Sequence, residues 1–224
     1  MLKEYPDDEH CVLAMVESIA SHLASEIAAQ GHAVLAVSGG RSPIPLFHAL
    51  SEAAIDWPRV LITLVDERFV PTDHDDSNEN LVRRHLLRAR AAKAPFQGLI
   101  THPRDIMSCV LQANRQARSM TVAILGMGED GHTASLFPDA PELAAGLDLH
   151  NPHAYLAITP ISAPHGRISL TLAALLKARH LLVALKGQHK RAMFEQARMA
   201  ATAELPISLL IHQTVRPLDV YWTR

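Results

Sequence analysis

Two kinds of hydrophobic pattern alternate along this 224-residue chain. Apolar residues that recur every three or four positions predict helices over residues 8–30, 42–54, 77–90, 105–118, 168–177 and 188–201. Short, almost continuously apolar runs predict buried strands over residues 33–38, 60–65, 121–126, 154–159 and 180–185. The alternating tail LDVYWT predicts a closing strand. Helices and strands in regular alternation indicate a parallel sheet covered by helices.

The breaks between these segments carry the residues that begin and end helices. Gly31 follows the first helical pattern and suits a left-handed stop. The second helix is expected to open at Ser42-Pro43, with the serine hydroxyl as cap, and the third to be capped by Asp76 or Ser77. No repeat or linker interrupts the chain, so residues 1–224 are predicted to form a single domain. The expected fold is a Rossmann-like, parallel-rich sheet flanked by helices on both faces.

The composition narrows the possible ligands. A formal net charge of −2 provides no overall field to attract nucleic acid or an anionic membrane, so local charges must bind any anionic ligand. We found no signal-peptide pattern and no apolar window of membrane-spanning length, and therefore expect a cytoplasmic protein. Cys11 and Cys109 lie in apolar helical patterns and are expected to be small buried side chains, which fits a reducing compartment.

Polar loops follow four of the predicted strands, and three of these loops contain glycine. Their sequences are SGGRS (38–42), DERFVP (66–71), GMGEDGH (126–132) and KGQHK (186–190). Ligands of open α/β sheets bind at the carboxyl ends of the strands. We therefore expect the four loops to converge on one site.

The first loop has the features of a phosphate-binding turn. Gly39 and Gly40 let backbone amides point at an anion, and the helix that begins near Ser42 adds its positive N-terminal end. Ser38 adds a hydroxyl. The nucleotide-binding pattern G-x-x-x-x-G-K-[ST] is absent, which favours one phosphate on a small molecule. The alternative is a plain strand-to-helix turn.

The second loop, DERFVPTDHDDSNENL, is rich in carboxylates. A metal site built from carboxylates and imidazoles is one reading, but no spacing here matches a defined metal site. A second reading is a solvated loop whose aspartates cap the next helix. In a third, Arg68 holds phosphate and Asp66 shapes the floor of a polar pocket. We expect no bound metal.

The third loop, GMGEDGHTASLFP, contains G-x-G-x-x-G but does not fit a dinucleotide-binding loop. Pro138 stops any helix soon after the glycines, and Asp148 lies in a loop rather than at the end of the next strand. The turn instead presents Asp130, Gly131 and His132 at the carboxyl end of a strand. Because histidine titrates near neutral pH, His132 is the candidate general base.

Four blocks in this order resemble the 6-phosphogluconolactonase family: AVSGGRSPIPLFHAL, LVDERFVPTDHDDSNENLVRRHLL, ILGMGEDGHTASLFP and HGRISLTLAALLKARHLLVALKGQHKRAMFEQA. The resemblance implies hydrolysis of 6-phospho-D-glucono-1,5-lactone by His132, oriented by Asp130, without metal or cofactor. It also implies cationic contacts to the substrate from Arg68, Arg167 and Lys190, with Lys186 as a weaker substitute for Lys190. Ser38, Gly39, Gly40 and Ser42 would hold the phosphate, with Asp66 and Gly131 in the pocket.

Two other functions share this fold. Glucosamine-6-phosphate deaminases carry a catalytic glutamate a few residues after DGH, where this chain reads TASLFP. Sugar-phosphate sensors of the same fold carry a DNA-binding helix-turn-helix, for which there is no room before the first strand. Arg41 and Glu129 depart from the family pattern, and the segment after Pro206 resembles it only loosely. The expected partner is a small sugar-phosphate lactone, and the expected assembly is a monomer or a homodimer.

Overall fold

The computed structural model describes residues 1–224 and has at its centre a seven-stranded sheet in which every pairing is parallel. From one edge to the other, the strands are β1 (Leu2–Tyr5), β10 (Leu218–Thr223), β9 (His180–Lys186), β6 (Val122–Leu125), β2 (Ala33–Val37), β3 (Val60–Leu64) and β5 (Phe96–Gln97). The predicted parallel-rich α/β sheet is confirmed. Strand β1 is an addition, because a four-residue edge strand with mixed polarity leaves no clear pattern in the sequence.

The order of the strands fixes where a ligand can enter. From β2 the chain builds the sheet outward through β3 to β5, and then returns to the other side of β2 to place β6, β9 and β10. The direction of winding therefore reverses between β2 and β6. Loops leave the carboxyl ends of these two strands in opposite directions and open a crevice there.

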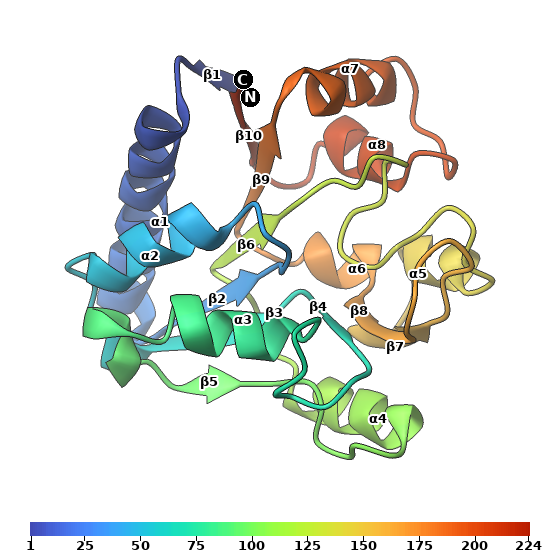
Figure 1. Cartoon of the computed structure of the whole chain (residues 1–224), viewed down its shortest axis with the longest axis horizontal. Coiled ribbons are helices and arrows are strands. Elements are labelled where there is room, and N and C mark those ends of the chain that lie inside the picture. The colour runs from blue at the N-terminus through green and yellow to red at the C-terminus, as the bar shows by residue number, and fades with distance from the viewer.

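A small second sheet stands beside the first (Figure 1). Its three antiparallel strands are β4 (Asp66–Arg68), β8 (Arg167–Leu170) and β7 (Tyr155–Ile158). Residues 66–68 were expected in a loop and residues 168–170 in a helix, and both expectations are wrong. These two segments pair with each other, and only Leu172–Leu175 (α6) is helical in the second region.

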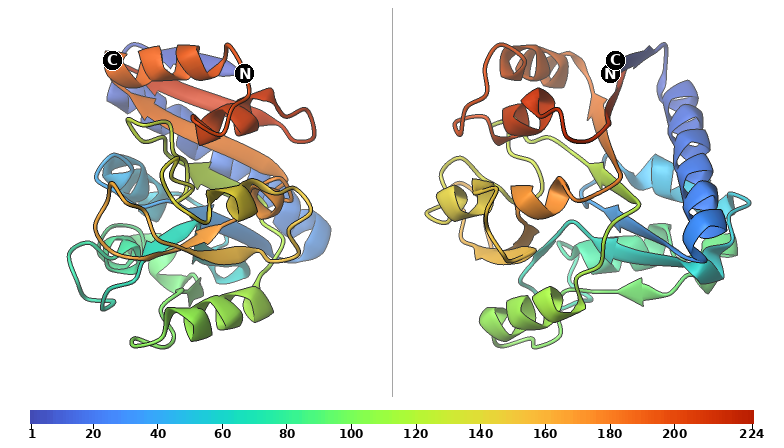
Figure 2. Two further views of the ribbon diagram at one scale, coloured as in Figure 1. Left: turned by 90° about the vertical axis from the view of Figure 1, so that its right-hand side faces the viewer. Right: turned by 180° about the vertical axis from the view of Figure 1, so that it is seen from behind.

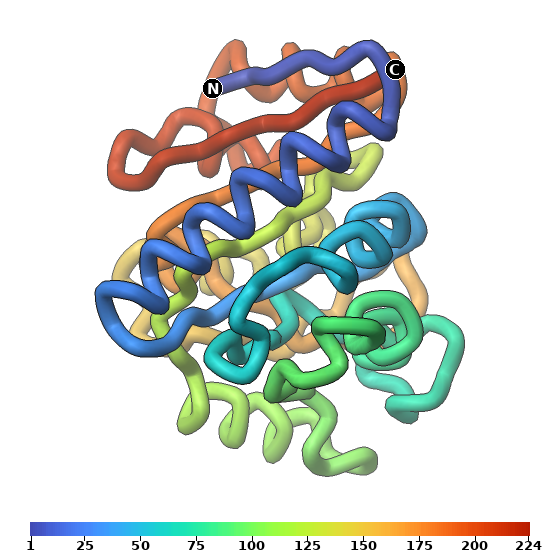
Figure 3. The backbone as a smooth tube through the Cα atoms, turned by 90° about the vertical axis from the view of Figure 1, so that its left-hand side faces the viewer, coloured from blue at the N-terminus to red at the C-terminus, as the bar shows by residue number.

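Helices cover both faces of the main sheet, as predicted. In Figure 1, α1 and α2 lie on one side of the sheet and α6, α7 and α8 on the other, while Figure 3 shows α1 running obliquely across its strands. The remaining helical bounds are α1 (Asp8–Gln30), α2 (Ile44–Glu52), α3 (Asn78–His85), α4 (Ile106–Gln116), α5 (Leu143–Leu147), α7 (Gln188–Ala197) and α8 (Pro206–His212), with 3₁₀ turns at η1 (Trp57–Arg59) and η2 (Ala89–Lys93).

The helix ends agree with the sequence in part. Gly31 ends α1 with a φ of 81°, and Ser77 caps α3 by accepting a hydrogen bond from Asn80 N. Ser42 makes no capping bond, because α2 begins after Pro43. The expected helix over residues 77–90 stops at His85. Because β1 pairs with β10 in parallel, the two chain ends lie at opposite ends of this strand pair, as the left view of Figure 2 shows.

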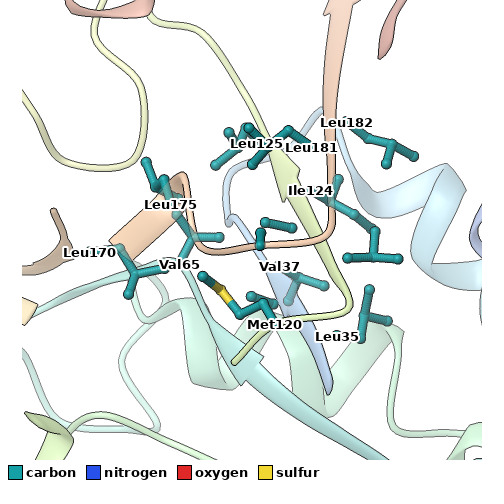
Figure 4. Close-up of a cluster of buried hydrophobic side chains, with 14 of the residues drawn as sticks. Leu35, Val37, Val65, Met120, Ile124, Leu125, Leu170, Leu175, Leu181 and Leu182 are labelled. Atoms are coloured by element: carbon teal, nitrogen blue, oxygen red, sulfur yellow. The ribbon is translucent and has the colours of Figure 1, made fainter. Parts of the chain in front are cut away.

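One large core fills the space between the sheet and its helices. Figure 4 shows part of it, with Leu35, Ile124 and Leu182 on one side of the central strands and Val65, Leu170 and Leu175 on the other. Cys11 and Cys109 are buried and unpaired by disulfide, as expected.

Helix α1 corrects one expectation from the sequence. It is long and apolar enough, by length and composition, to cross a membrane, with a mean hydropathy of 1.3. In this fold, however, Met15, Ile19 and Leu23 of α1 are buried in the core. A helix that covers a sheet carries such a face, so its apolar content has a structural reason here.

Candidate active site

A cavity of about 290 Å³ opens where the sheet changes its direction of winding, between β2 and β6. Residues from the loops after β2, β6 and β9 line it together with β4 and the start of α3. The four polar loops therefore converge, as expected from their places at the carboxyl ends of strands. The polar side chains in the lining are those of Ser38, Ser42, Asp66, Arg68, Asn78, His132, Lys186 and Lys190, and four glycines, Gly39, Gly40, Gly126 and Gly128, line it as well.

The turn after β2 needs its two glycines. A Cβ on Gly39 would lie 1.8 Å from Oδ1 of Asn78, so no larger residue fits between the turn and α3. Gly40 has a φ of +91°, in the region that side chains other than glycine rarely adopt. The hydroxyl of Ser38 is buried at the cavity wall and has no hydrogen-bond partner in the protein. This turn therefore presents the unpaired Ser38 hydroxyl and the backbone of two glycines to the cavity.

His132 and Asp130 form a hydrogen-bonded pair. Nδ1 of His132 lies 2.6 Å from Oδ1 of Asp130, and the His132 ring stacks on Phe137 with centroids 4.0 Å apart. A carboxylate only accepts, so Nδ1 carries the proton and Nε2 is left free. Burial opposes ionisation of Asp130, but the hydrogen bonds and charge of His132 hold the pKa of that carboxyl below its ordinary value.

The backbone of the Gly126–Pro138 loop holds this pair in place. Gly128 N donates to His132 O at 2.8 Å, and a Cβ on Gly128 would come within 2.1 Å of His132 Nδ1. Gly131 does not line the cavity. It has a φ of 78°, and its carbonyl accepts from Ile207 N at 3.0 Å. The C-terminal region, to which the sequence assigned no site role, thus supports the turn through α8.

A second set of contacts ties this loop to the small sheet. Ser135 Oγ donates to Oδ2 of Asp66 at 2.6 Å, and Asn78 Nδ2 donates to Asp66 O at 2.8 Å. Both Asp66 and Asn78 line the cavity. Sequence reasoning selected neither Ser135 nor Asn78 as a site residue. Only the DSN triplet within the second block hinted at Asn78, and nothing local revealed the partner of Ser135.

Glu67, next to Asp66, connects β4 to α3. Its two carboxylate oxygens accept four hydrogen bonds, from Asn78 N, Glu79 N, Arg68 N and the Ser77 hydroxyl. The side chain is fully buried, and burial raises the pKa of Glu67 to about 7 against the effect of these bonds. This carboxyl group sets the position of Asn78 and Asp66 relative to the cavity.

Three cations reach the cavity. Arg68 donates to the Asp76 carbonyl, Lys186 is paired with Asp8, and Lys190 donates to the Met127 carbonyl. Burial lowers the pKa of Lys190 from its ordinary value, although the nearby carboxylates of Glu129 and Asp130 favour its charged form. Arg41 is exposed and lies outside the lining.

Arg167 does not line the cavity. It is only 6% exposed, its Nη2 donates to Pro164 O at 2.9 Å, and its Nε has no partner. Register places it directly opposite Arg68 across β4 and β8, and its guanidinium lies 5.9 Å from the Phe137 ring. Burial and the neighbouring charge of Arg68 lower its pKa. Arg167 therefore lies beside Arg68 and near Phe137, but outside the lining of the cavity.

In the acidic loop after β4, Asp76 makes hydrogen bonds and ion-pair contacts with neighbouring histidines. Asp76 lies beside His165 at 3.2 Å, and His74 Nδ1 accepts from the Asp76 amide at 3.1 Å. No group of three or more His, Cys, Asp or Glu side chains is arranged to hold a metal ion. The geometry gives the metal reading of this loop no support.

Comparisons with known sequences agree with the blocks noted above. The profile of the family described as glucosamine-6-phosphate isomerases/6-phosphogluconolactonase matches residues 6–222. The chain is 41% identical to the 6-phosphogluconolactonase of Neisseria meningitidis over 221 residues, which cover 95% of this chain and 94% of that protein. It is 42% identical to the 6-phosphogluconolactonase of Pseudomonas aeruginosa over 214 residues, covering 93% and 88%.

Solved structures give the same result. The crystal structure of a 6-phosphogluconolactonase from Shewanella baltica superimposes with a TM-score of 0.95 at 38% identity, covering 100% of this chain and 97% of that one. A monomeric glucosamine-6-phosphate deaminase matches with a TM-score of 0.81 at 14% identity, which shows the fold alone. The profile match and the relatives near 40% identity together establish that the chain belongs to the glucosamine-6-phosphate isomerase/6-phosphogluconolactonase family.

Proposed function

We propose that this protein hydrolyses 6-phospho-D-glucono-1,5-lactone to 6-phosphogluconate, with His132 as the general base. The observation that carries the proposal is the His132–Asp130 pair, whose histidine lines the same cavity as a glycine turn suited to phosphate. Relatives that align with nearly the whole chain are named 6-phosphogluconolactonases. The reaction would form the second step of the oxidative pentose phosphate pathway.

His132 and Asp130 supply the proton transfers. With Nδ1–H donated to Asp130, the free Nε2 of His132 takes a proton from water as the water oxygen attacks the C1 carbonyl of the lactone. The resulting imidazolium is stabilised by the Asp130 carboxylate and returns the proton to the ring oxygen as the C1–O bond breaks. One histidine serves both steps, and the ester bond needs no metal, cofactor or covalent intermediate.

The phosphate is assigned to the turn after β2 and to the nearby cations. The buried Ser38 hydroxyl lacks a partner, and an anionic oxygen would satisfy it. Arg68 and Arg167 lie directly opposite each other, and like charges in that position repel unless an anion lies near them. Ser42, Gly39, Gly40 and Lys190 line the same cavity. Asp66 completes the floor, and we propose that the protein acts in the cytoplasm as a monomer or homodimer.

Two alternative functions, a deaminase and a sugar-phosphate sensor, can be tested separately. A deaminase would release ammonia from glucosamine 6-phosphate, but the segment after His132, TASLFP, offers no glutamate for that chemistry. A sensor would bind a sugar phosphate without turnover. The His132–Asp130 pair favours an enzyme over a sensor, because binding alone does not require an oriented base.

The deciding experiment compares the wild type with His132→Ala. The lactone is generated in place by glucose-6-phosphate dehydrogenase, and hydrolysis is measured above the spontaneous rate. We expect the wild type to accelerate hydrolysis and the variant to lose roughly 10²- to 10⁴-fold in kcat with nearly unchanged affinity for 6-phosphogluconate. No acceleration by the wild type would reject the proposal, and full activity in the variant would reject His132 as the base.

A further inference from the structure

A second cavity, of about 690 Å³, lies at the opposite edge of the main sheet. It opens beside the amino-terminal ends of β3 and β6, whereas the candidate active site lies at the carboxyl ends. The two cavities share no lining residue. Ligand binding here would be separate from the reaction proposed above, and the inference does not depend on it.

The rim of this second cavity is cationic. Four basic side chains line it, Arg115, Arg118, Lys177 and Arg216, and no aspartate or glutamate does. All four residues are exposed, and none forms an ion pair within the protein. In a chain with a net charge of −2, an acid-free group of four cations is a local departure from the average surface. Such a rim attracts anions carrying several charges.

The floor of the cavity is apolar, and its wall is held by hydrogen bonds. Met120 and Leu170 lie on the floor, and Figure 4 shows both within the hydrophobic core. Asn114 of α4 fixes the wall, because its amide donates to Tyr155 O and accepts from Tyr155 N, both at 2.9 Å. A cavity of this size, with an apolar floor and a few charged groups, has the properties of a small-molecule site.

We propose that this second cavity binds an organic polyanion of nucleotide size. Its phosphates would lie among Arg115, Arg118, Lys177 and Arg216, and its planar or apolar part would cover Met120 and Leu170. Inorganic polyphosphate can pair only with the basic residues of the rim, and an uncharged nucleoside can pack only on the apolar floor. The two halves of the site therefore predict a ranking among simple probes.

Calorimetric titration with three probes tests this ranking. ATP in the presence of EDTA is expected to bind more tightly than tripolyphosphate, and adenosine is expected to bind most weakly. Because the cations are exposed, ATP binding should weaken as salt is added. Absence of ATP binding would overturn the proposal, and equal affinity for ATP and tripolyphosphate would overturn its organic part.

Reversing the charge of basic residues at the second cavity tests whether ATP binds there. The double variant Arg115→Glu/Lys177→Glu should bind ATP at least about tenfold more weakly, since two exposed contacts become repulsive. Arg104→Glu reverses an exposed charge outside the cavity and should bind like the wild type. Lys190→Glu, in the other cavity, should also leave ATP affinity unchanged. An unaffected double variant, or ATP binding lost in Lys190→Glu, would reject this location.

Discussion

Asp130 accepts a hydrogen bond from Nδ1 of His132 at 2.6 Å, and the same carboxylate oxygen also accepts from the His132 backbone amide at 3.2 Å. The bond from the backbone amide holds the Asp130 carboxylate in place, and the bond from Nδ1 therefore holds the imidazole ring in place. The consequence is a histidine with a set tautomer and a set orientation before substrate binds. The carboxylate also provides the charge that a transient imidazolium needs.

Asp130→Asn tests the need for that charge. The amide oxygen still accepts from Nδ1, but it cannot stabilise an imidazolium, and a rotated amide would impose the wrong tautomer. We expect kcat for the lactone to fall by roughly 10²-fold or more with KM within about twofold of the wild type. Initial rates, corrected for spontaneous hydrolysis, measure both constants. An unchanged kcat would show that Asp130 only shapes the turn.

Gly128→Ala tests the packing around the pair. The added Cβ would fall 2.1 Å from His132 Nδ1 and 2.4 Å from Asp130 Oδ1, so the ring and carboxylate must move. We expect loss of most of kcat with little change in binding of 6-phosphogluconate. Gly126→Ala is the matched control, because a Cβ there meets nothing within 4 Å. Equal activity of the two variants would contradict the tight geometry proposed for His132.

The sequence predicted what local patterns can encode. The strands β2, β3, β6 and β9 are buried on both faces and therefore read as apolar runs. The turns that hold Gly39 and His132 follow such runs directly, which placed the residues after them at one edge of the sheet. Both the main sheet and the convergence of the loops followed from these patterns.

The parts that were wrong or absent depend on distant partners. Residues 168–170 resemble a helix in isolation, and they form a strand because Arg167–Leu170 pairs with Asp66–Arg68. Ser135 and Asp66 are 69 residues apart, so their hydrogen bond leaves no local signal. The place of Arg167 beside Arg68 likewise follows from the pairing of β8 with β4. Its contact with substrate therefore stays a prediction, and it is less direct than that of Arg68.

The pH dependence of product binding tests the role of Lys190. Burial lowers its pKa from the ordinary lysine value, so Lys190 loses its charge as pH rises while exposed lysines stay charged. We expect the Kd for 6-phosphogluconate to rise with pH, and the rise to begin below the ordinary lysine pKa of 10.5. Lys190→Arg keeps its charge at these pH values and should remove most of that rise. Calorimetry avoids the alkaline breakdown of the lactone, and identical profiles for both proteins would show that Lys190 does not contact the product's charged groups.

Glu67→Gln tests the buried contacts that connect β4 to α3. All four hydrogen bonds of Glu67 are accepted, and an amide NH₂ cannot accept, so two donors lose their partner. We expect the free energy of unfolding at pH 8 to fall by about 2–3 kcal/mol in urea titrations. Glu195→Gln, which removes a partly exposed partner of Arg191 and Arg198, should cost less than about 1 kcal/mol.

The difference in unfolding free energy between the wild type and Glu67→Gln is expected to depend on pH. Burial raises the pKa of Glu67 from 4.5 to about 7 in the folded protein, so the folded state binds the proton more tightly than the unfolded chain does. The wild type therefore gains stability from this group as pH falls from about 7 towards 4.5, and Glu67→Gln cannot. The gap in unfolding free energy between the two proteins should widen from pH 8 to pH 5. A gap that narrows over this range would mean that the four hydrogen bonds outweigh burial and keep Glu67 ionised.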